Sequence, residues 1–160
     1  MSKNKHIKGL VLHCSDSDFG SATLIKGWHV NERGWDDIGY TAVICNGQVE
    51  NNTYMAFMDG AIEWGRDIDV SGAHVRGFND LEGLCLIGRS GKFTINQLEA
   101  ARRVILYFIE HHGLDASKIY GHSDLDDKKP HCCGLDVKEF VKACINLEDL
   151  SRFVGRLSDG

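Results

Sequence analysis

The sequence predicts a single α/β domain in which helices flank a central mixed β-sheet. Two patterns predict this class. Strand-like apolar segments alternate with amphipathic helical segments along the chain. The apolar run at 83–88 is bounded by glycines and is typical of a central strand buried on both faces. A length of 160 residues fits one domain, 1–160, with a core at about 7–147.

The first half of the chain predicts two strands, a helix and a turn. The expected elements are a strand at 7–13, an amphipathic helix at 22–34 and a strand at 38–45. Asn46-Gly47 is a strong two-residue hairpin signal, so residues 48–50 are expected to pair back. Residues 51–62 mix turn residues with apolar ones, which indicates an insertion. It is either a lid over part of the surface or a packed loop that extends the hairpin.

The second half continues the alternation of strands and helices. The expected elements are a strand at 83–88, a long helix from Thr94 to Gly113, a short strand at 118–122 and a last helix at 137–147. Thr94 and Gln97 have the spacing of a capping box. Asp136 precedes the last helix as its N-cap.

Charge and composition exclude several classes of partner. A formal net charge of -5 gives no general affinity for nucleic acid. No apolar run approaches the ~18 residues that a membrane span needs. The basic start leads into a short, interrupted apolar stretch and makes a poor signal peptide, so we expect synthesis in the cytoplasm. We expect a monomer that binds neither nucleic acid nor membrane, with mostly buried, reduced cysteines.

The segment from His122 to Cys132 contains several side chains that can bind a metal ion or stabilise negative charge. These residues place an imidazole and a thiol ten positions apart, with two lysines and a second imidazole between them. Zinc accepts nitrogen and sulfur donors, and its hydrolytic sites commonly use three protein ligands and leave a position for water. His13, at the expected end of the first strand, is the best candidate for the remaining ligand.

Each of these residues also has an ordinary explanation. His13, taken alone, fits a hydrogen-bonded histidine of the core. Cys132 fits a thiol in a polar loop, because its spacing from His122 is not that of a zinc finger. From spacing alone, metal binding and a simple polar loop are equally open.

Five short motifs follow one another in a specific order over roughly residues 7–145. They are Leu12-His13-Cys14-Ser15; Trp28-His29 with Gly34-Trp35 and Ile38-Gly39-Tyr40; Gly65-Arg66-Asp67; Gly72-Ala73-His74, Gly77-Phe78-Asn79 and Gly83-Leu84-Cys85-Leu86-Ile87-Gly88; and Gly121-His122 with Cys132 and Asp136. In this combination the chain resembles the zinc-dependent N-acetylmuramoyl-L-alanine amidases of the type 2 family. The likeness is strongest to the small phage members, and the family shares its fold with peptidoglycan-recognition proteins.

The resemblance implies a zinc ion held by three residues, which are His13, His122 and Cys132. His131 is the alternative third ligand. The family lysine stands two residues before that ligand, and Lys129 has this spacing from His131. The spacing from Cys132 to Asp136 matches the family and favours Cys132.

The resemblance also implies catalytic and substrate-binding residues. Tyr40 would lie near the water at the metal. Lys129, with Lys128 as the alternative, would donate to the carbonyl oxygen as it becomes an oxyanion. Such preorganised donors are worth about 3–4 kcal/mol in the transition state. His74 would line the substrate groove, although a role in holding its own loop fits equally well.

The implied reaction is hydrolysis of the amide between N-acetylmuramic acid and the L-alanine of the stem peptide, in peptidoglycan or a muropeptide. The expected setting is a phage endolysin that acts on the host cell wall. The alternatives are a non-catalytic peptidoglycan-binding domain and a cytoplasmic amidase that recycles muropeptides. Non-catalytic members of the fold typically lack the thiolate ligand, so Cys132 favours catalysis.

Overall fold

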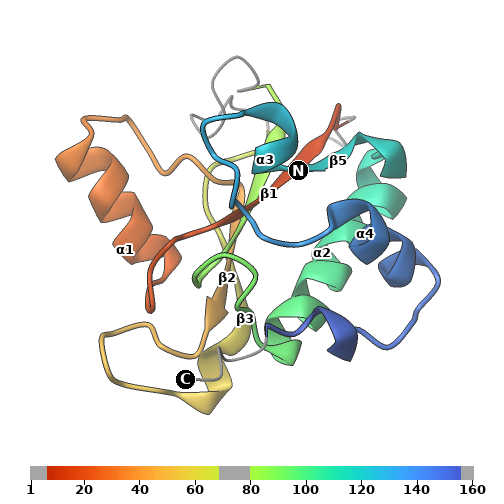
Figure 1. The fold of residues 1–160 in the computed structure, drawn as a ribbon. Coiled ribbons are helices and arrows are strands. Elements are labelled where there is room, and N and C mark those ends of the chain that lie inside the picture. The colour runs from red at the N-terminus through yellow and green to blue at the C-terminus, as the bar shows by residue number, and fades with distance from the viewer. Residues whose placement is uncertain (1–6, 69–79, 156–160) are drawn as a thin grey trace.

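The computed structural model describes residues 7–68 and 80–155, and these contain one five-stranded sheet (Figure 1). The strands are β1 (Leu10–Cys14), β2 (Ala42–Asn46), β3 (Asp59–Trp64), β4 (Glu82–Leu86) and β5 (Ile119–Gly121). Their order is β3-β2-β4-β1-β5, and only the β2–β3 pair is antiparallel among these strands. The predicted mixed sheet is therefore confirmed. The extent of the domain over 1–160 stays a prediction.

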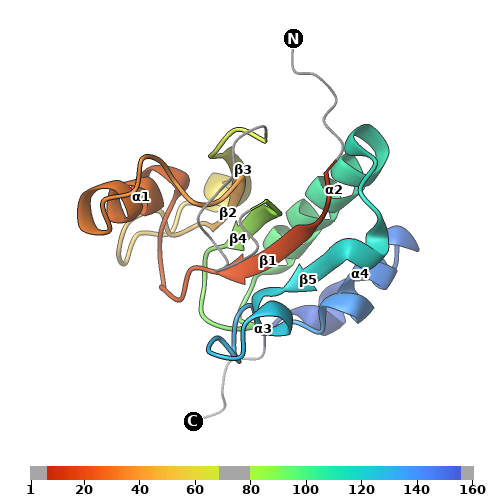
Figure 2. The same ribbon diagram turned by 90° about the horizontal axis from the view of Figure 1, so that it is seen from above.

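Helices lie on both faces of this sheet (Figure 2). The α-helices are α1 (Ala22–Gly27), α2 (Ile95–His112), α3 (His122–Leu125) and α4 (Val137–Ile145). A π-helix at Trp28–Glu32 continues α1, and short 3-10 turns occur at Ala56–Met58, Ala116–Lys118 and Ser151–Phe153. Among the described residues, no helix has the length and apolar character needed to cross a membrane.

The two faces of the sheet carry two separate apolar clusters. The larger one joins the sheet to α2 and α4 and contains Leu10, Leu12, Leu84, Leu86, Phe108 and Phe140. The smaller one lies on the α1 side and contains Ile25, Val43 and Cys85. Successive residues of a strand face opposite sides. His13, which pairs with Cys85, therefore shares the α1 face, while Cys14 packs against the larger cluster.

The long helix α2 begins and ends as predicted. The Thr94 side chain accepts the Gln97 backbone N–H, the Gln97 side chain accepts that of Thr94, and Gly113 ends the helix in the left-handed region at φ 62°. The buried Gln97 amide also donates to the carbonyls of Ile44 and Ile87 at 3.1 and 2.8 Å. This side chain ties the start of α2 to the ends of β2 and β4.

The predicted hairpin at Asn46-Gly47 is wrong. Residues 48–50 do not form a strand, and the antiparallel partner of β2 is β3. Gly47 does turn the chain, but its carbonyl accepts the Met55 N–H at 2.8 Å, which closes a longer loop. The predicted insertion at 51–62 is therefore a largely exposed loop followed by most of the edge strand β3.

Strand β3 was not predicted because it begins with Asp59-Gly60, two residue types that are typical of turns. In the fold, Asp59 accepts the Thr94 hydroxyl at 2.5 Å, at the start of α2. Gly60 lies so close to α2 that a Cβ atom would be 2.7 Å from the Asn96 carbonyl oxygen. Tertiary packing against the helix, and not a turn, explains these two residues.

Boundaries of other elements also differ from the prediction by a few residues. The helix expected at 22–34 changes to a π-helix after Gly27, a residue of low helix propensity. The strand expected at 38–45 begins at Ala42, because the Ile38 and Gly39 N–H groups donate to the side chains of Asp37 and His29. The last helix ends at Ile145, two residues early. The predicted free cysteines are confirmed, since all six are unpaired.

Candidate active site

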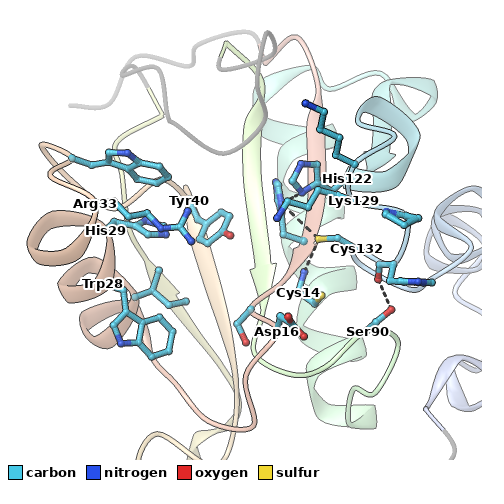
Figure 3. A pocket seen from close by; sticks show the side chains of 17 residues that line it. Cys14, Asp16, Trp28, His29, Arg33, Tyr40, Ser90, His122, Lys129 and Cys132 are labelled. Carbon is cyan, nitrogen blue, oxygen red and sulfur yellow. Dashed lines mark hydrogen bonds between the residues drawn. The ribbon is translucent and has the colours of Figure 1, made fainter.

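Two histidines and a cysteine, His13, His122 and Cys132, meet beside the ends of β1 and β5. Figure 3 shows His122 and Cys132 side by side in this place. These strands are parallel neighbours, so their carboxyl ends lie side by side, and β5 leads directly into α3 at His122. The Nδ1 atoms of His13 and His122 are 3.1 Å apart. The Cys132 Sγ atom is 4.0 Å from His13 Nδ1, and ligand atoms of all three residues lie within 4.8 Å of one another.

Backbone hydrogen bonds hold the cysteine in this position. The Ser123 N–H donates to the Cys132 carbonyl at 2.7 Å, which closes the loop between His122 and Cys132. The Cys14 N–H points at Cys132 Sγ, 3.4 Å away. An N–H dipole directed at sulfur favours its thiolate form, the form that binds metals.

The geometry and the donor types fit a metal ion. A tetrahedral ion with bonds of about 2.0–2.3 Å separates its ligand atoms by roughly 3.3–3.8 Å. The separations of 3.1 and 4.0 Å lie on either side of that range. Two nitrogens and one sulfur form a donor set that suits zinc. The three residues can therefore hold a metal ion together.

The pKa shifts of His122 and Cys132 have opposite consequences for metal binding. Burial lowers the pKa of His122, so the imidazole is neutral and can offer a lone pair. Contact with the Cys14 thiol, followed by burial, raises the pKa of Cys132. Deprotonation of this thiol therefore requires a neighbouring positive charge, such as that of a metal ion bound by the three residues.

The structure separates the two candidates for the third ligand. Within residues 7–68 and 80–155, the cluster that could hold a metal ion consists of His13, His122 and Cys132, without His131. The His131 side chain is exposed, and its carbonyl accepts a hydrogen bond from the Ser90 hydroxyl. The ligand roles themselves stay a prediction.

The cluster lies in a cavity of about 560 Å³ between the α1 side and the loop that follows α3 (Figure 3). Trp28, His29 and Arg33 lie on one wall, on the α1 side, and Lys129 and Cys132 lie on the opposite wall. Trp35 and Lys128 also line the cavity. The predicted substrate-binding residue His74 lies outside the described residues.

Tyr40 lies between the two walls. Its ring centre is 5.0 Å from that of His13 and 5.5 Å from that of His29. Its hydroxyl points toward the side that holds His122 and Cys132 (Figure 3). Burial raises the pKa of Tyr40, so the hydroxyl stays protonated and can donate a hydrogen bond into the cavity.

His29 holds the segment that leads to Tyr40. Its Nδ1 atom accepts the Gly39 N–H at 2.9 Å, and its ring lies 4.4 Å from that of Trp35. Burial, together with the charges of Arg33 and Arg66, lowers the pKa of His29 to about 4. His29 is therefore a neutral acceptor at pH 7 and a positioning residue.

Sequence reasoning missed Arg33, which stands just before the Gly34-Trp35 motif. Its guanidinium group lies 5.3 Å from the Trp35 ring centre, at cation–π distance. Arg33 is exposed and lines the cavity. In the sequence, only the position of Arg33 next to this motif distinguishes it from other arginines. An exposed arginine does not contribute to the apolar periodicity from which elements are predicted.

The cavity lining is cationic although the protein is acidic overall, at a formal charge of -5. Three of its residues are basic, namely Arg33, Lys128 and Lys129. The acidic lining residue Asp16 is paired with Arg89 at 3.3 Å. This contrast with the net charge favours an anionic ligand in the cavity.

Comparison with known sequences finds phage endolysins. The chain is 30% identical over 157 residues to the endolysin of Enterobacteria phage K11, covering 88% of this chain and 89% of the relative. It is 28% identical over 142 residues to the endolysin of Escherichia phage T7, covering 82% and 83%. No family model matches the chain.

Comparison with solved structures finds the same fold in two groups of proteins. The N-acetylmuramoyl-L-alanine amidase LysC from Clostridium intestinale URNW has a TM-score of 0.71 at 23% identity, covering 91% of this chain and 89% of its own. Drosophila PGRP-LB has a TM-score of 0.66 at 26% identity, covering 98% and 87%. A variant of PGRP-LB in complex with tracheal cytotoxin has a TM-score of 0.63 at 28% identity, covering 81% and 79%.

Proposed function

The chain belongs to the family of phage endolysins, and on that premise we propose that it is a zinc-dependent N-acetylmuramoyl-L-alanine amidase. It cleaves the amide between N-acetylmuramic acid and the L-alanine of the stem peptide in the host cell wall. One observation carries this proposal. His13, His122 and Cys132 bring their ligand atoms within 4.8 Å of one another inside a cavity large enough for part of a peptide.

The residues of the cavity have complementary tasks in this reaction. Zinc bound by the three ligands supplies a Lewis acid and lowers the pKa of water to about 7. Lys129 stabilises the negative charge that develops on the carbonyl oxygen during attack. The protonated Tyr40 hydroxyl orients the attacking water or shares this charge.

The basic lining supports a stem peptide as the substrate. Stem peptides carry free carboxylates, and Arg33 offers a planar set of donors that can bind a carboxylate in a bidentate manner. Stacking on Trp35 holds this guanidinium group over the cavity wall. A relative of the same fold is in complex with tracheal cytotoxin, which supports a ligand from this chemical class.

Arg33→Gln is expected to raise KM for a soluble muropeptide about tenfold, because one charge-assisted contact of ~1.4 kcal/mol is lost. The value of kcat should change little, since Arg33 lies on the cavity wall opposite Lys129 and Cys132. Steady-state kinetics on a synthetic N-acetylmuramoyl tripeptide measures both constants. Arg103→Gln, an exposed arginine on α2 across the sheet, is the control. Equal KM values in the two variants would refute the role of Arg33.

Mass spectrometry of purified peptidoglycan after digestion tests the function directly. Free stem peptides that begin at L-alanine are the expected product, together with intact glycan strands. Cleaved glycan strands would contradict the proposal. Binding without any released product would assign the chain to the non-catalytic alternative.

A further inference from the structure

Asp126 lies directly behind one of the zinc-binding histidines. Its Oδ2 atom is 3.7 Å from Nε2 of His122, longer than a direct hydrogen bond but close enough for the carboxylate charge to attract a proton on that nitrogen. His122 turns its other nitrogen, Nδ1, toward His13. Nε2 is therefore the nitrogen that faces away from the cluster. The His122 and Asp126 side chains are only 10% and 25% exposed, so solvent screens this contact weakly.

The same residue organises the turn that carries both lysines. Its second carboxylate oxygen, Oδ1, accepts the Lys128 N–H at 2.9 Å. Its backbone carbonyl accepts the Lys129 N–H at 3.0 Å, and its own N–H donates to the His122 carbonyl at 3.1 Å. One carboxylate thus contacts a metal-binding imidazole with one oxygen and the lysine turn with the other.

We propose that Asp126 is a positioning residue that couples His122 to the Lys128–Lys129 turn. A carboxylate behind Nε2 favours the tautomer that carries its proton there. This leaves the lone pair of Nδ1 directed at the metal and makes the imidazole a stronger ligand. The proposal rests on the proposed zinc site. It adds the reason why the histidine and the lysine turn keep a fixed relative position.

The coupling has a consequence for catalysis. Lys129 can hold an oxyanion only if its backbone stays in register with the metal ligands, because an oxyanion donor acts over about 3 Å. Asp126 connects the lysine turn to His122 through backbone-involving hydrogen bonds of 2.9–3.1 Å. It accepts the N–H groups of both lysines and donates its own N–H to the His122 carbonyl. Loss of the carboxylate should therefore weaken metal binding first and lower kcat as well.

The test compares Asp126→Asn with Asp127→Asn in the full chain. Both variants remove one negative charge from adjacent positions, and Asp127 is exposed. The asparagine at 126 can still accept the Lys128 N–H, so its effect reports the carboxylate behind His122. Competition with a chromophoric chelator measures the zinc dissociation constant. We expect affinity to fall about 10- to 100-fold in Asp126→Asn and to stay within about twofold of wild type in Asp127→Asn.

A second readout follows the proton on Nε2 of His122. In the zinc-loaded wild type, NMR of ¹⁵N-labelled histidine should show this proton exchanging slowly with water. Asp126→Asn should speed the exchange, while Asp127→Asn should not. If Asp126→Asn does not fold, Asp126→Ser takes its place, because its hydroxyl can also accept the Lys128 N–H.

The outcomes separate this inference from the proposed function. Wild-type protein that binds zinc and hydrolyses the amide, together with equal affinities in the Asp126→Asn and Asp127→Asn variants, would overturn only the role of Asp126. Wild-type protein that binds no zinc would overturn the proposed function, and with it this inference. Weakened zinc binding and faster proton exchange in Asp126→Asn alone support the coupling.

Discussion

Cys132→Ser is expected to abolish both zinc binding and amide hydrolysis. The thiolate of Cys132 is the only sulfur ligand of the proposed site and its only negatively charged one. A serine hydroxyl stays protonated near neutral pH and is a poor zinc ligand. The two remaining imidazoles do not make up the three protein ligands usual in a hydrolytic site. Elemental analysis of the purified protein should show zinc falling from stoichiometric to undetectable, with product formation lost in parallel.

His131→Ala is the matched control for this substitution. The side chain of His131 is exposed and lies outside the ligand cluster, so zinc content and activity should remain close to wild type. The opposite pattern, with zinc retained in Cys132→Ser and lost in His131→Ala, would make His131 the third ligand. Thermal unfolding of both variants without metal shows whether any loss comes from misfolding.

Lys129→Met is expected to lower kcat by about 10²–10³, which corresponds to the ~3–4 kcal/mol that one oxyanion donor contributes. KM and zinc content should change little, because the interaction forms only as the carbonyl oxygen gains charge. Methionine keeps most of the apolar stem of lysine and removes the ammonium group. Steady-state kinetics with a soluble muropeptide, alongside elemental analysis, measures all three quantities.

Lys128→Met tests the assignment between the two lysines. Lys129 is close enough to His122 for its charge to contribute to the lowered pKa of that histidine. The Lys128 N–H donates to the Asp126 side chain, which fixes its backbone. Lys128→Met should therefore lower kcat by no more than about threefold. A larger loss in Lys128→Met than in Lys129→Met would reverse the assignment.

The elements that local chemistry specifies were predictable. The run at 83–88 became the central strand β4, and Thr94, Gln97 and Gly113 set the ends of α2 as their side chains and backbone require. Strand β3 was not predictable. Gly60 is required by the close approach of α2, and this contact between distant segments leaves no pattern in the local sequence. The hairpin predicted at Asn46-Gly47 was wrong because the Gly47 carbonyl accepts the Met55 N–H and so closes a longer loop. This contact also leaves no pattern in the local sequence.

The candidate site shows a similar division. His13, His122 and Cys132 could be named because few residue types bind zinc and their order matched a known arrangement. Arg33 and Asp126 could not be named, because exposed or half-exposed charged residues are common in any sequence. Their importance depends on neighbours that folding supplies, namely the Trp35 ring for Arg33 and the outer nitrogen of His122 for Asp126.

The hydrogen bond from the Ser123 N–H to the Cys132 carbonyl has a consequence for the thermodynamics of metal capture. It closes the chain between His122 and Cys132, so one short loop carries both donors. Ordering this loop on folding lowers the entropic cost of bringing the two donors to one ion.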